Sequence, residues 1–363
     1  MHSIVVIYLR GGADGLSLVP PLFDDDYYRM RPSLALRVGA SERERRALDV
    51  GHAFGLHGDF APLAGWFEDR SMSVVLAAGS EDQTRSHFEA QDLMELSGQS
   101  DGWLARALRA RVNAVPSSLA AIAIGHAVPE ALRGFAATAV SDISELVSGT
   151  PDDDQLDGIL SLYAQLDDSS DERELRQGAT SSVSALKSLR RLAGAPQPAG
   201  SFPDTALGKG LATAAQLLNH REELGLTAVT IDQDGWDTHF AQAGLVCDRV
   251  SDLARSLAAL REALGDGWDH TTCLVMTEFG RRVQENVSLG ADHGRASAML
   301  LFGGQLPWAP FVGQWPGLSE AALEGPGDLR VTTNYREPLT WALQRLGVDP
   351  AQVFGPPQRG AAH

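Results

Sequence analysis

The chain has 363 residues, of which 44% are hydrophobic and 21% are charged. This is the composition of an ordinary globular protein, and it excludes a disordered chain or a small disulfide-stapled scaffold. The 30 Lys and Arg residues face 47 Asp and Glu residues, for a formal net charge of −17, so we expect no nucleic-acid partner. Cys247 and Cys273 are the only cysteines, so any metal must be held by histidines and carboxylates rather than by a thiolate cluster.

The N-terminus lacks the basic segment and long apolar run of a signal peptide. No apolar run reaches the roughly 18 to 20 residues needed to cross a bilayer, so we expect no membrane span. As it stands the sequence favours a cytoplasmic protein. A periplasmic or secreted protein would follow if an export signal had been removed, because two cysteines fit either redox compartment. The sequence leaves the compartment and the oligomeric state open.

Five short apolar runs, several of them rich in β-branched residues, predict buried strands at residues 4–9, 73–78, 226–231, 272–277 and 297–302. Helical periodicity lies between them, most clearly over residues 242–264. Strands that alternate with helices predict an α/β fold with a doubly wound, mostly parallel sheet.

Residues 141–218 have a different character. They begin with an acidic segment at 151–154, continue with helical spacing, and contain a Pro-rich break at 195–200. We expect a helical insertion, or cap, that lies over or beside the binding cleft and sets substrate size. It would separate a first part of the α/β core, residues 1–140, from a second part, residues 219–363.

Chemically active side chains follow or precede each predicted strand. Ligands of open parallel sheets bind beyond the carboxyl ends of the strands, where the loops converge. His nitrogens and carboxylate oxygens are the ligands of Zn, Mn and similar divalent ions. The pattern therefore predicts a metal site with seven candidate ligands: Asp14, His57, Asp237, His239, Glu278, Asp292 and His293. Of these, His57 is least clearly tied to a strand.

Each candidate also has a purely structural alternative. Asp14 lies between small residues that favour a turn, and residues 237–239 could begin a helix. Ser86, followed three residues later by Glu89, fits a capping box. The metal interpretation is favoured because so many polar residues coincide at one edge of one predicted sheet.

Seven short motifs, in chain order, resemble the DUF1501 family of bacterial proteins. They are RGGADG at 10–15, FGLH at 54–57, TRSHFEAQD at 84–92, GW at 102–103, GWDTH at 235–239, TEFGR at 277–281 and DHG at 292–294. The resemblance runs from residue 4 to about residue 346. The family in turn resembles the alkaline phosphatase and sulfatase superfamily.

This resemblance implies an alkaline phosphatase-like α/β core that carries metal ions. It implies that Asp14 is the ligand after the first strand and that the loop 84–87 carries the nucleophile. The remaining ligands implied are Asp237, His239, Glu278, Asp292 and His293.

The expected function is metal-dependent hydrolysis of phosphate or sulfate esters in a small-molecule or glycan substrate, with one or two divalent ions. Zn is the first choice, and Mn, Mg or Ca are alternatives. Ser86 is preferred over Thr84 as nucleophile, Arg85 would hold the substrate oxygens, and His87 belongs to the same catalytic loop. The alternative is a non-catalytic metal- or ligand-binding protein on the same fold.

A second hydrolase motif is excluded by its context. Residues 98–102 match G-x-S-x-G, but no apolar strand precedes them, as a nucleophile elbow requires.

Overall fold

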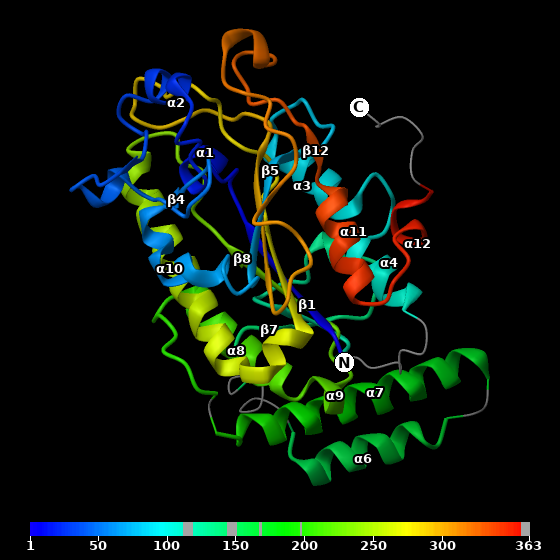
Figure 1. Cartoon of the computed structure of the whole chain (residues 1–363). Coiled ribbons are helices and arrows are strands. Elements are labelled where there is room, and N and C mark those ends of the chain that lie inside the picture. The colour runs from blue at the N-terminus through cyan, green and yellow to red at the C-terminus, as the bar shows by residue number, and fades with distance from the viewer. Residues whose placement is uncertain (112–118, 144–150, 167–168, 197, 357–363) are drawn as a thin grey trace.

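The computed structural model describes residues 1–111, 119–143, 151–166, 169–196 and 198–356. Its centre is a nine-stranded sheet in the order β11-β5-β10-β9-β1-β8-β6-β7, with β12 also paired to β5 (Figure 1). A small second sheet holds β2 (Arg37–Val38), β3 (Arg46–Leu48) and β4 (Leu56–His57). The bounds in the large sheet are β1 (Ser3–Leu9), β5 (Met72–Gly79), β6 (Ala121–Ile124), β7 (Thr138–Val140), β8 (Ala228–Gln233), β9 (Thr271–Met276), β10 (Ser297–Gly303), β11 (Phe311–Val312) and β12 (Thr333–Asn334).

The sheet is mostly parallel, which confirms the predicted fold class. The central strand β1 pairs in parallel with β8 and with β9. The exception is β10, which runs antiparallel to both β9 and β5. This reversal brings the segment before β10 to the edge of the sheet at which the parallel strands end.

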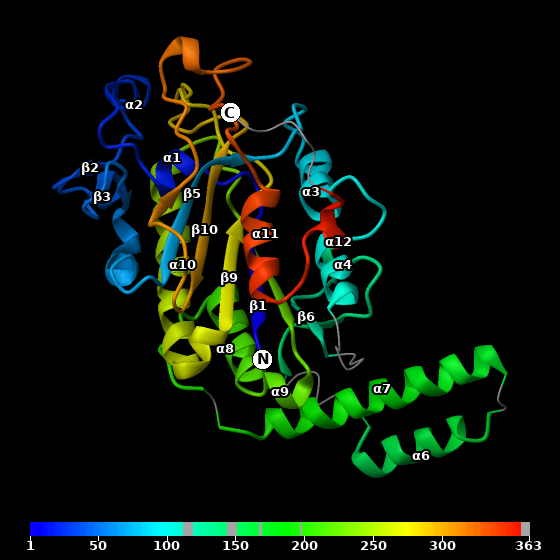
Figure 2. The same cartoon turned by 45° about the vertical axis from the view of Figure 1, so that its right-hand side comes forward.

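Helices cover both faces of the sheet, as in a doubly wound fold (Figure 2). The side chains of β1 alternate accordingly, because successive residues of a strand point to opposite faces. Val5, Ile7 and Leu9 join the apolar core beneath α8 (Ala206–Asn219) and α10 (Gln242–Leu264). Ile4, Val6 and Tyr8 join a second core, which is covered by α3 (His87–Leu96), α4 (Trp103–Ala110), α11 (Arg336–Arg345) and α12 (Ala351–Phe354).

Shorter elements fill the connections between these layers. The short α-helices are α1 (Gly15–Leu18), α2 (Asp25–Met30) and α9 (Arg221–Leu224). The 3₁₀ segments are η1 (Arg43–Arg45), η2 (Gly58–Trp66), η3 (Glu130–Leu132), η4 (Gly265–His270) and η5 (Glu320–Ala322).

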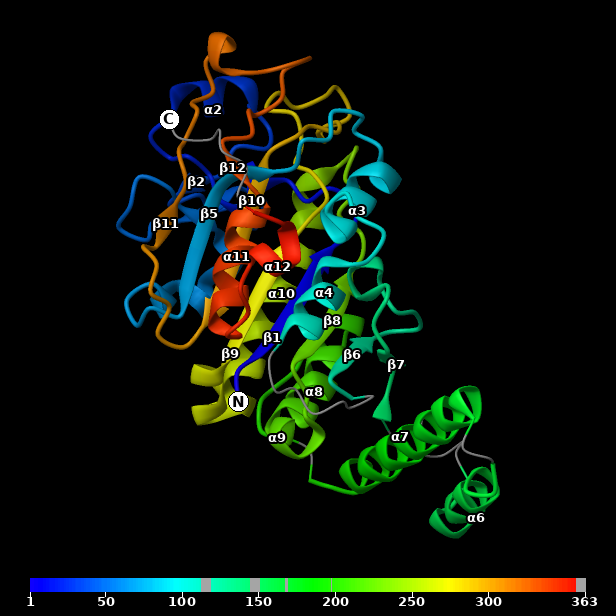
Figure 3. The ribbon, with the colours of Figure 1, turned by 90° about the vertical axis from the view of Figure 1, so that its right-hand side faces the viewer.

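The stretch 141–218 is largely helical where the structure describes it, but its position differs from the expected cap. Helices α6 (Asp153–Tyr163) and α7 (Ser170–Ala193) form a hairpin tied together by the ion pairs Lys187–Asp157 and Arg190–Asp153. Figures 1 and 3 place this hairpin at the end of the sheet where β1 begins, opposite the end at which the parallel strands finish. A position over or beside the cleft was therefore wrong, because helical spacing carries no information about which end of a sheet a helix occupies.

Helix α8 belongs to the same stretch but forms part of the core. Its Leu211, Ala214 and Leu218 are fully buried in the core shared with α10. We retain a division into three parts as a proposal, with the insertion restricted to α6 and α7. No helix in the described ranges combines the length and the apolar character that a membrane span requires.

Candidate metal centre

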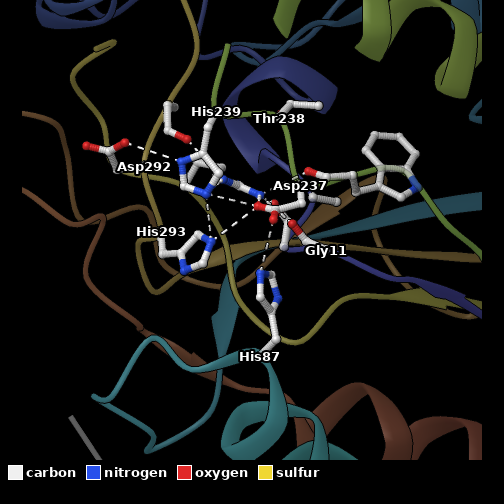
Figure 4. Close-up of polar contacts among 12 residues, drawn as sticks. Gly11, His87, Asp237, Thr238, His239, Asp292 and His293 are labelled. Carbon is white, nitrogen blue, oxygen red and sulfur yellow. Dashed lines mark hydrogen bonds and ion pairs between the residues drawn. The ribbon is translucent and has the colours of Figure 1, made fainter. Parts of the chain in front are cut away.

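Five chain segments meet at the carboxyl end of the parallel strands (Figure 4). The turn after β1 contributes Gly11, the first residue of α3 is His87, and the loop after β8 carries Asp237 and His239. Glu278 follows β9. Asp292 and His293 precede β10 and reach the same edge because β10 is antiparallel.

The three histidines share one feature, which is that each Nδ1 atom faces a hydrogen-bond acceptor. His87 Nδ1 lies 2.8 Å from Glu278 Oε1, His293 Nδ1 lies 2.9 Å from the Arg85 carbonyl oxygen, and His239 Nδ1 lies 3.4 Å from Asp292 Oδ1. Carboxylates and carbonyls can only accept, so each Nδ1 must carry the proton. The lone pair of each neutral ring is then on Nε2. Carboxylate or carbonyl partners of this kind orient metal-ligating histidines.

The Nε2 atoms of the same rings converge on the Asp237 carboxylate (Figure 4). His239 Nε2 and His293 Nε2 lie 3.0 and 3.2 Å from Asp237 Oδ1, and His87 Nε2 lies 3.6 Å from Asp237 Oδ2. His87 Nε2 is buried without a hydrogen-bond partner, and the Nε2 atoms of His239 and His293 are 2.9 Å apart. Two lone pairs at that separation repel unless a proton or a cation lies between them.

These separations fit a metal ion. Ligand atoms about 2.1 Å from a tetrahedral zinc ion lie roughly 3.4 Å from one another. The group formed by His87, Asp237 and His293 has all three ligand atoms within 4.8 Å of one another, and His239 is close to two of its members. We call His87, Asp237, His239 and His293 the metal-site group.

A buried arginine fixes Asp237. Arg281 is 1% exposed, and its Nη2 donates to Asp237 Oδ1 at 2.6 Å. The guanidinium also donates to backbone carbonyls, at Gly12, Ala291 and Trp236 among others. Its Nη1 lies 3.4 Å from His239 Nε2 as well. Burial would raise the pKa of Asp237, but the hydrogen bond and the positive charge of Arg281 lower it to about 2.

Glu278 is also held as a carboxylate. It is 1% exposed, and burial alone would raise its pKa. Hydrogen bonds from His87, Gln91 and the Gly11 amide instead lower the pKa to about 2. The carboxylates of Asp237, Glu278 and Asp292 outnumber the two guanidinium groups that lie against them, those of Arg281 and Arg282. A metal cation would offset this excess of negative charge.

Two glycines after β1 make room for this arrangement. Gly11 has φ +116°, and a Cβ atom there would lie 2.4 Å from the Asp237 backbone nitrogen. Gly12 has φ +71°, and its Cβ would lie 2.4 Å from the Phe279 ring, which packs against His87 and His293. A larger residue at either position would displace the loop that carries Asp237 or the ring that supports the histidines.

Asp14 does not belong to the metal-site group, contrary to expectation. It is 1% exposed and caps α1, and its carboxylate forms a buried ion pair with Arg31. Ser17 and Gln242 donate to the same carboxylate. Both oxygens of Asp14 already accept hydrogen bonds, which favours the structural alternative over metal binding.

His57 was also expected as a ligand, and it lies in a separate buried cluster with Asp59 and Cys247. Its Nδ1 accepts a hydrogen bond from the Asp59 backbone amide, so its proton is on Nε2, 3.6 Å from Cys247 Sγ. This tautomer has no lone pair on Nε2, and Arg43 already neutralises Asp59. His57 therefore caps η2 through an Nδ1 atom that accepts a hydrogen bond. In the metal-site group, by contrast, Nδ1 donates and Nε2 carries the lone pair.

The residues of the predicted catalytic loop 84–87 have different hydrogen-bond partners. The guanidinium of Arg85, which was expected to hold substrate oxygens, pairs with the fully buried Asp328. Its backbone, at φ +60°, instead presents the carbonyl that orients His293. The Thr84 hydroxyl donates to Asp82 in an exposed turn. Ser86 is the N-cap residue of α3, but its side chain forms no capping bond, so the capping box considered for Ser86 and Glu89 is not formed.

The structure arranges some of the predicted site residues differently from the expectation. His87 was taken as catalytic, yet its Nε2 belongs to the metal-site group. Glu278 and Asp292 were taken as ligands, yet they orient histidines through Nδ1. Arg281 was not singled out as a partner of Asp237, although it lies in the TEFGR motif with Glu278.

Glu278→Gln tests this layered assignment. Glutamine keeps an oxygen that can accept from His87 but removes the charge. We expect metal affinity to fall about 10- to 100-fold, the effect typical of orienting residues around a metal. Competition with a chelator of known affinity measures the change. A complete loss of binding would identify Glu278 as a direct ligand instead.

Comparisons with known proteins support the family but not an activity. The family model of DUF1501, described as a protein of unknown function, matches residues 74–361. No curated protein matches the chain. Several solved structures are similar to it, among them the two that follow; their TM-scores are low, so they carry no argument about its function. The lipoteichoic acid synthase LtaP from Listeria monocytogenes has a TM-score of 0.37 and 7% identity, over 92% of this chain and 74% of that one. A variant of TAB5 alkaline phosphatase with bound Mg has a TM-score of 0.34 and 10% identity, over 85% and 93%.

Proposed function

The chain belongs to the DUF1501 family, whose description assigns no function, and we therefore propose a function from the site itself: metal-dependent hydrolysis of phosphate or sulfate esters. The observation that carries the proposal is the shared orientation of three histidines. Each has its Nδ1 engaged by an acceptor and its Nε2 directed at Asp237.

The metal-site group fits one divalent transition-metal ion, and three imidazoles favour Zn over Mg or Ca, which prefer oxygen ligands. A bound dication would supply Lewis-acid chemistry, polarising an ester oxygen and easing the loss of a proton from water or a hydroxyl group. Arg281 would keep Asp237 ionised and in place. Glu278, Asp292 and the Arg85 carbonyl would keep the imidazole lone pairs on Nε2.

An anionic ester would meet two positive groups at this site, the bound dication and the guanidinium of Arg282. Arg282 is partly exposed and lies 4.0 Å from Asp292, so its guanidinium would bind oxygens of a phosphate or sulfate in the position first assigned to Arg85. The acidic balance of the rest of the chain gives no reason to expect a polyanion.

Ser86 is the proposed nucleophile. It immediately precedes His87 at the start of α3, where the amide dipoles favour a negative charge, and its hydroxyl forms no capping bond. Thr84 is less suited because its hydroxyl is engaged by Asp82. Water is the attacking group in the alternative mechanism.

A non-catalytic metal-binding protein remains the second candidate function. The same histidine geometry supports it, because holding an ion requires only the metal-site group. The two functions differ in one measurable property, which is turnover of an ester by the metal-loaded protein.

The hydrolase proposal predicts that phosphate monoesters, phosphate diesters or sulfate esters are hydrolysed after addition of Zn or Mn, and that a chelator abolishes the activity. Ser86→Ala should then lower kcat by at least about 100-fold with metal content unchanged, since the hydroxyl would contribute attack rather than binding. Product release and metal content are measured on the same samples.

Thr84→Ala is the matched control, and it should retain activity. Full activity in both variants would replace the serine mechanism by attack of water. Absence of turnover with every metal and ester class would favour the binding protein.

A further inference from the structure

Two exposed phenylalanines are the sequence neighbours of two histidines of the metal-site group. Phe88 directly follows His87 and is 84% exposed, and Phe240 directly follows His239 and is 66% exposed. Single exposed apolar residues are common and need no explanation. Here, however, two phenylalanines are covalent neighbours of two residues of the metal-site group.

The side of the site at His239 carries further apolar residues on a loop bound to it. Ala241 and Gln242 donate backbone hydrogen bonds to the carbonyls of Ser288 and Leu289 at 3.0 and 2.9 Å. Asn286 donates to the His239 carbonyl at 2.9 Å. These bonds fix the loop 286–290 beside Phe240. The apolar residues that it exposes are Val287, at 102%, and Leu289, at 53%.

His87 lies on a different segment from His239, and the two rings approach Asp237 from different sides (Figure 4). Phe88 therefore belongs to the segment on one side of Asp237, and Phe240 belongs to the segment on another side. We call Phe88, Phe240, Val287 and Leu289 the apolar rim. Leu245, in the first turn of α10, is a further exposed apolar residue close in sequence to Phe240. The remaining exposed large apolar residues lie on other elements: Phe23, Val38, Val128, Leu162, Tyr163 and Leu175.

We infer that the ligand of this site is amphiphilic: an anionic phosphate or sulfate group lies at the metal-site group, and an adjoining alkyl or aryl chain packs on the apolar rim. This inference rests on the proposed function and adds the substrate class to it. A small, fully polar ester would leave the apolar rim in water. An apolar chain attached to the anion would cover it and remove both apolar surfaces from water.

The occupant is a single amphiphilic molecule rather than a bilayer. The formal net charge of −17 opposes approach to an anionic membrane surface. The proposed metal site would bind one anionic group at a time. The apolar chain that packs on the rim must therefore be covalently attached to that group.

Binding of a homologous series tests the inference without depending on turnover. Ethyl, butyl, hexyl and octyl phosphate, each below its micelle-forming concentration, are titrated calorimetrically into protein supplied with Zn. We expect the Kd to fall about two- to fourfold for each added methylene, because a fully buried methylene contributes about 0.8 kcal/mol. Phe240→Ser and Phe88→Ser should each flatten this dependence. Val38→Ser, an exposed apolar residue on β2, is the matched control and should leave the dependence unchanged.

The outcomes separate this inference from the proposed function. If the Kd depends on chain length, if this dependence is lost in Phe240→Ser, and if no ester is hydrolysed, the amphiphilic ligand is supported and the hydrolase proposal is refuted. Hydrolysis with equal Kd values across the series, or an undiminished dependence in both phenylalanine variants, would overturn the amphiphile. Cosedimentation with phosphatidylcholine vesicles, without dependence on chain length in the soluble series, would overturn it in favour of a membrane surface.

Discussion

His293→Ala is expected to abolish stoichiometric metal binding, with the Kd raised by at least about 100-fold, more than an orienting residue contributes. His293 Nε2 is close to both Asp237 and His239. The substitution therefore removes a proposed ligand that lies between two others. Asp237→Ala should have the same effect, because the carboxylate is the common neighbour of all three imidazoles. Metal content after dialysis, measured by elemental mass spectrometry, and titration calorimetry report both losses.

His220→Ala is the matched control for these variants. His220 is a half-buried histidine paired with Glu223, outside the metal-site group. It should keep one metal ion per chain at unchanged affinity. Retention of stoichiometric metal by His293→Ala and Asp237→Ala would refute the site.

Asp14→Asn is expected to lower the free energy of unfolding by about 3 to 5 kcal/mol while the folded protein keeps its metal. The substitution preserves the shape of the side chain but leaves the fully buried Arg31 without its counter-charge. Hydrogen bonds from Arg31, Ser17 and Gln242 hold the carboxylate in the native chain. Denaturant unfolding measures the first effect, and metal content of the folded fraction measures the second.

Ser17→Ala provides a milder test of the same role if Asp14→Asn fails to fold. It removes one buried donor to Asp14, and we expect a loss of about 1 kcal/mol with metal content unchanged. Metal loss in either variant, at intact folded content, would restore Asp14 as a ligand.

The sequence predicted the architecture well because the strongest signals are local. Buried strands such as β1, β5 and β9 are continuous apolar runs, and their alternation with helices indicates a parallel sheet. The direction of β10 could not be predicted, since an apolar run looks the same in either orientation. That direction decides where Asp292 and His293 lie.

The composition of the site was also predictable, but the roles within it were not. Carboxylates and histidines were expected at one edge, and Asp237, His239 and His293 meet there. Whether a carboxylate binds a metal, orients a histidine or pairs with an arginine depends on partners far away in the chain. Asp14 pairs with Arg31, and Glu278 reaches His87 across 191 residues. Spacing in the sequence does not reveal such contacts.

The most direct measurement is a crystal structure of the zinc-soaked protein with anomalous differences collected at the zinc edge. The account predicts one strong peak about 2.0 to 2.2 Å from Nε2 of His87, His239 and His293 and from the Asp237 carboxylate, with Nδ1 of each ring still bound to its acceptor. A peak at Asp14 or at the cluster of His57, Asp59 and Cys247, with none beside Asp237, would contradict it.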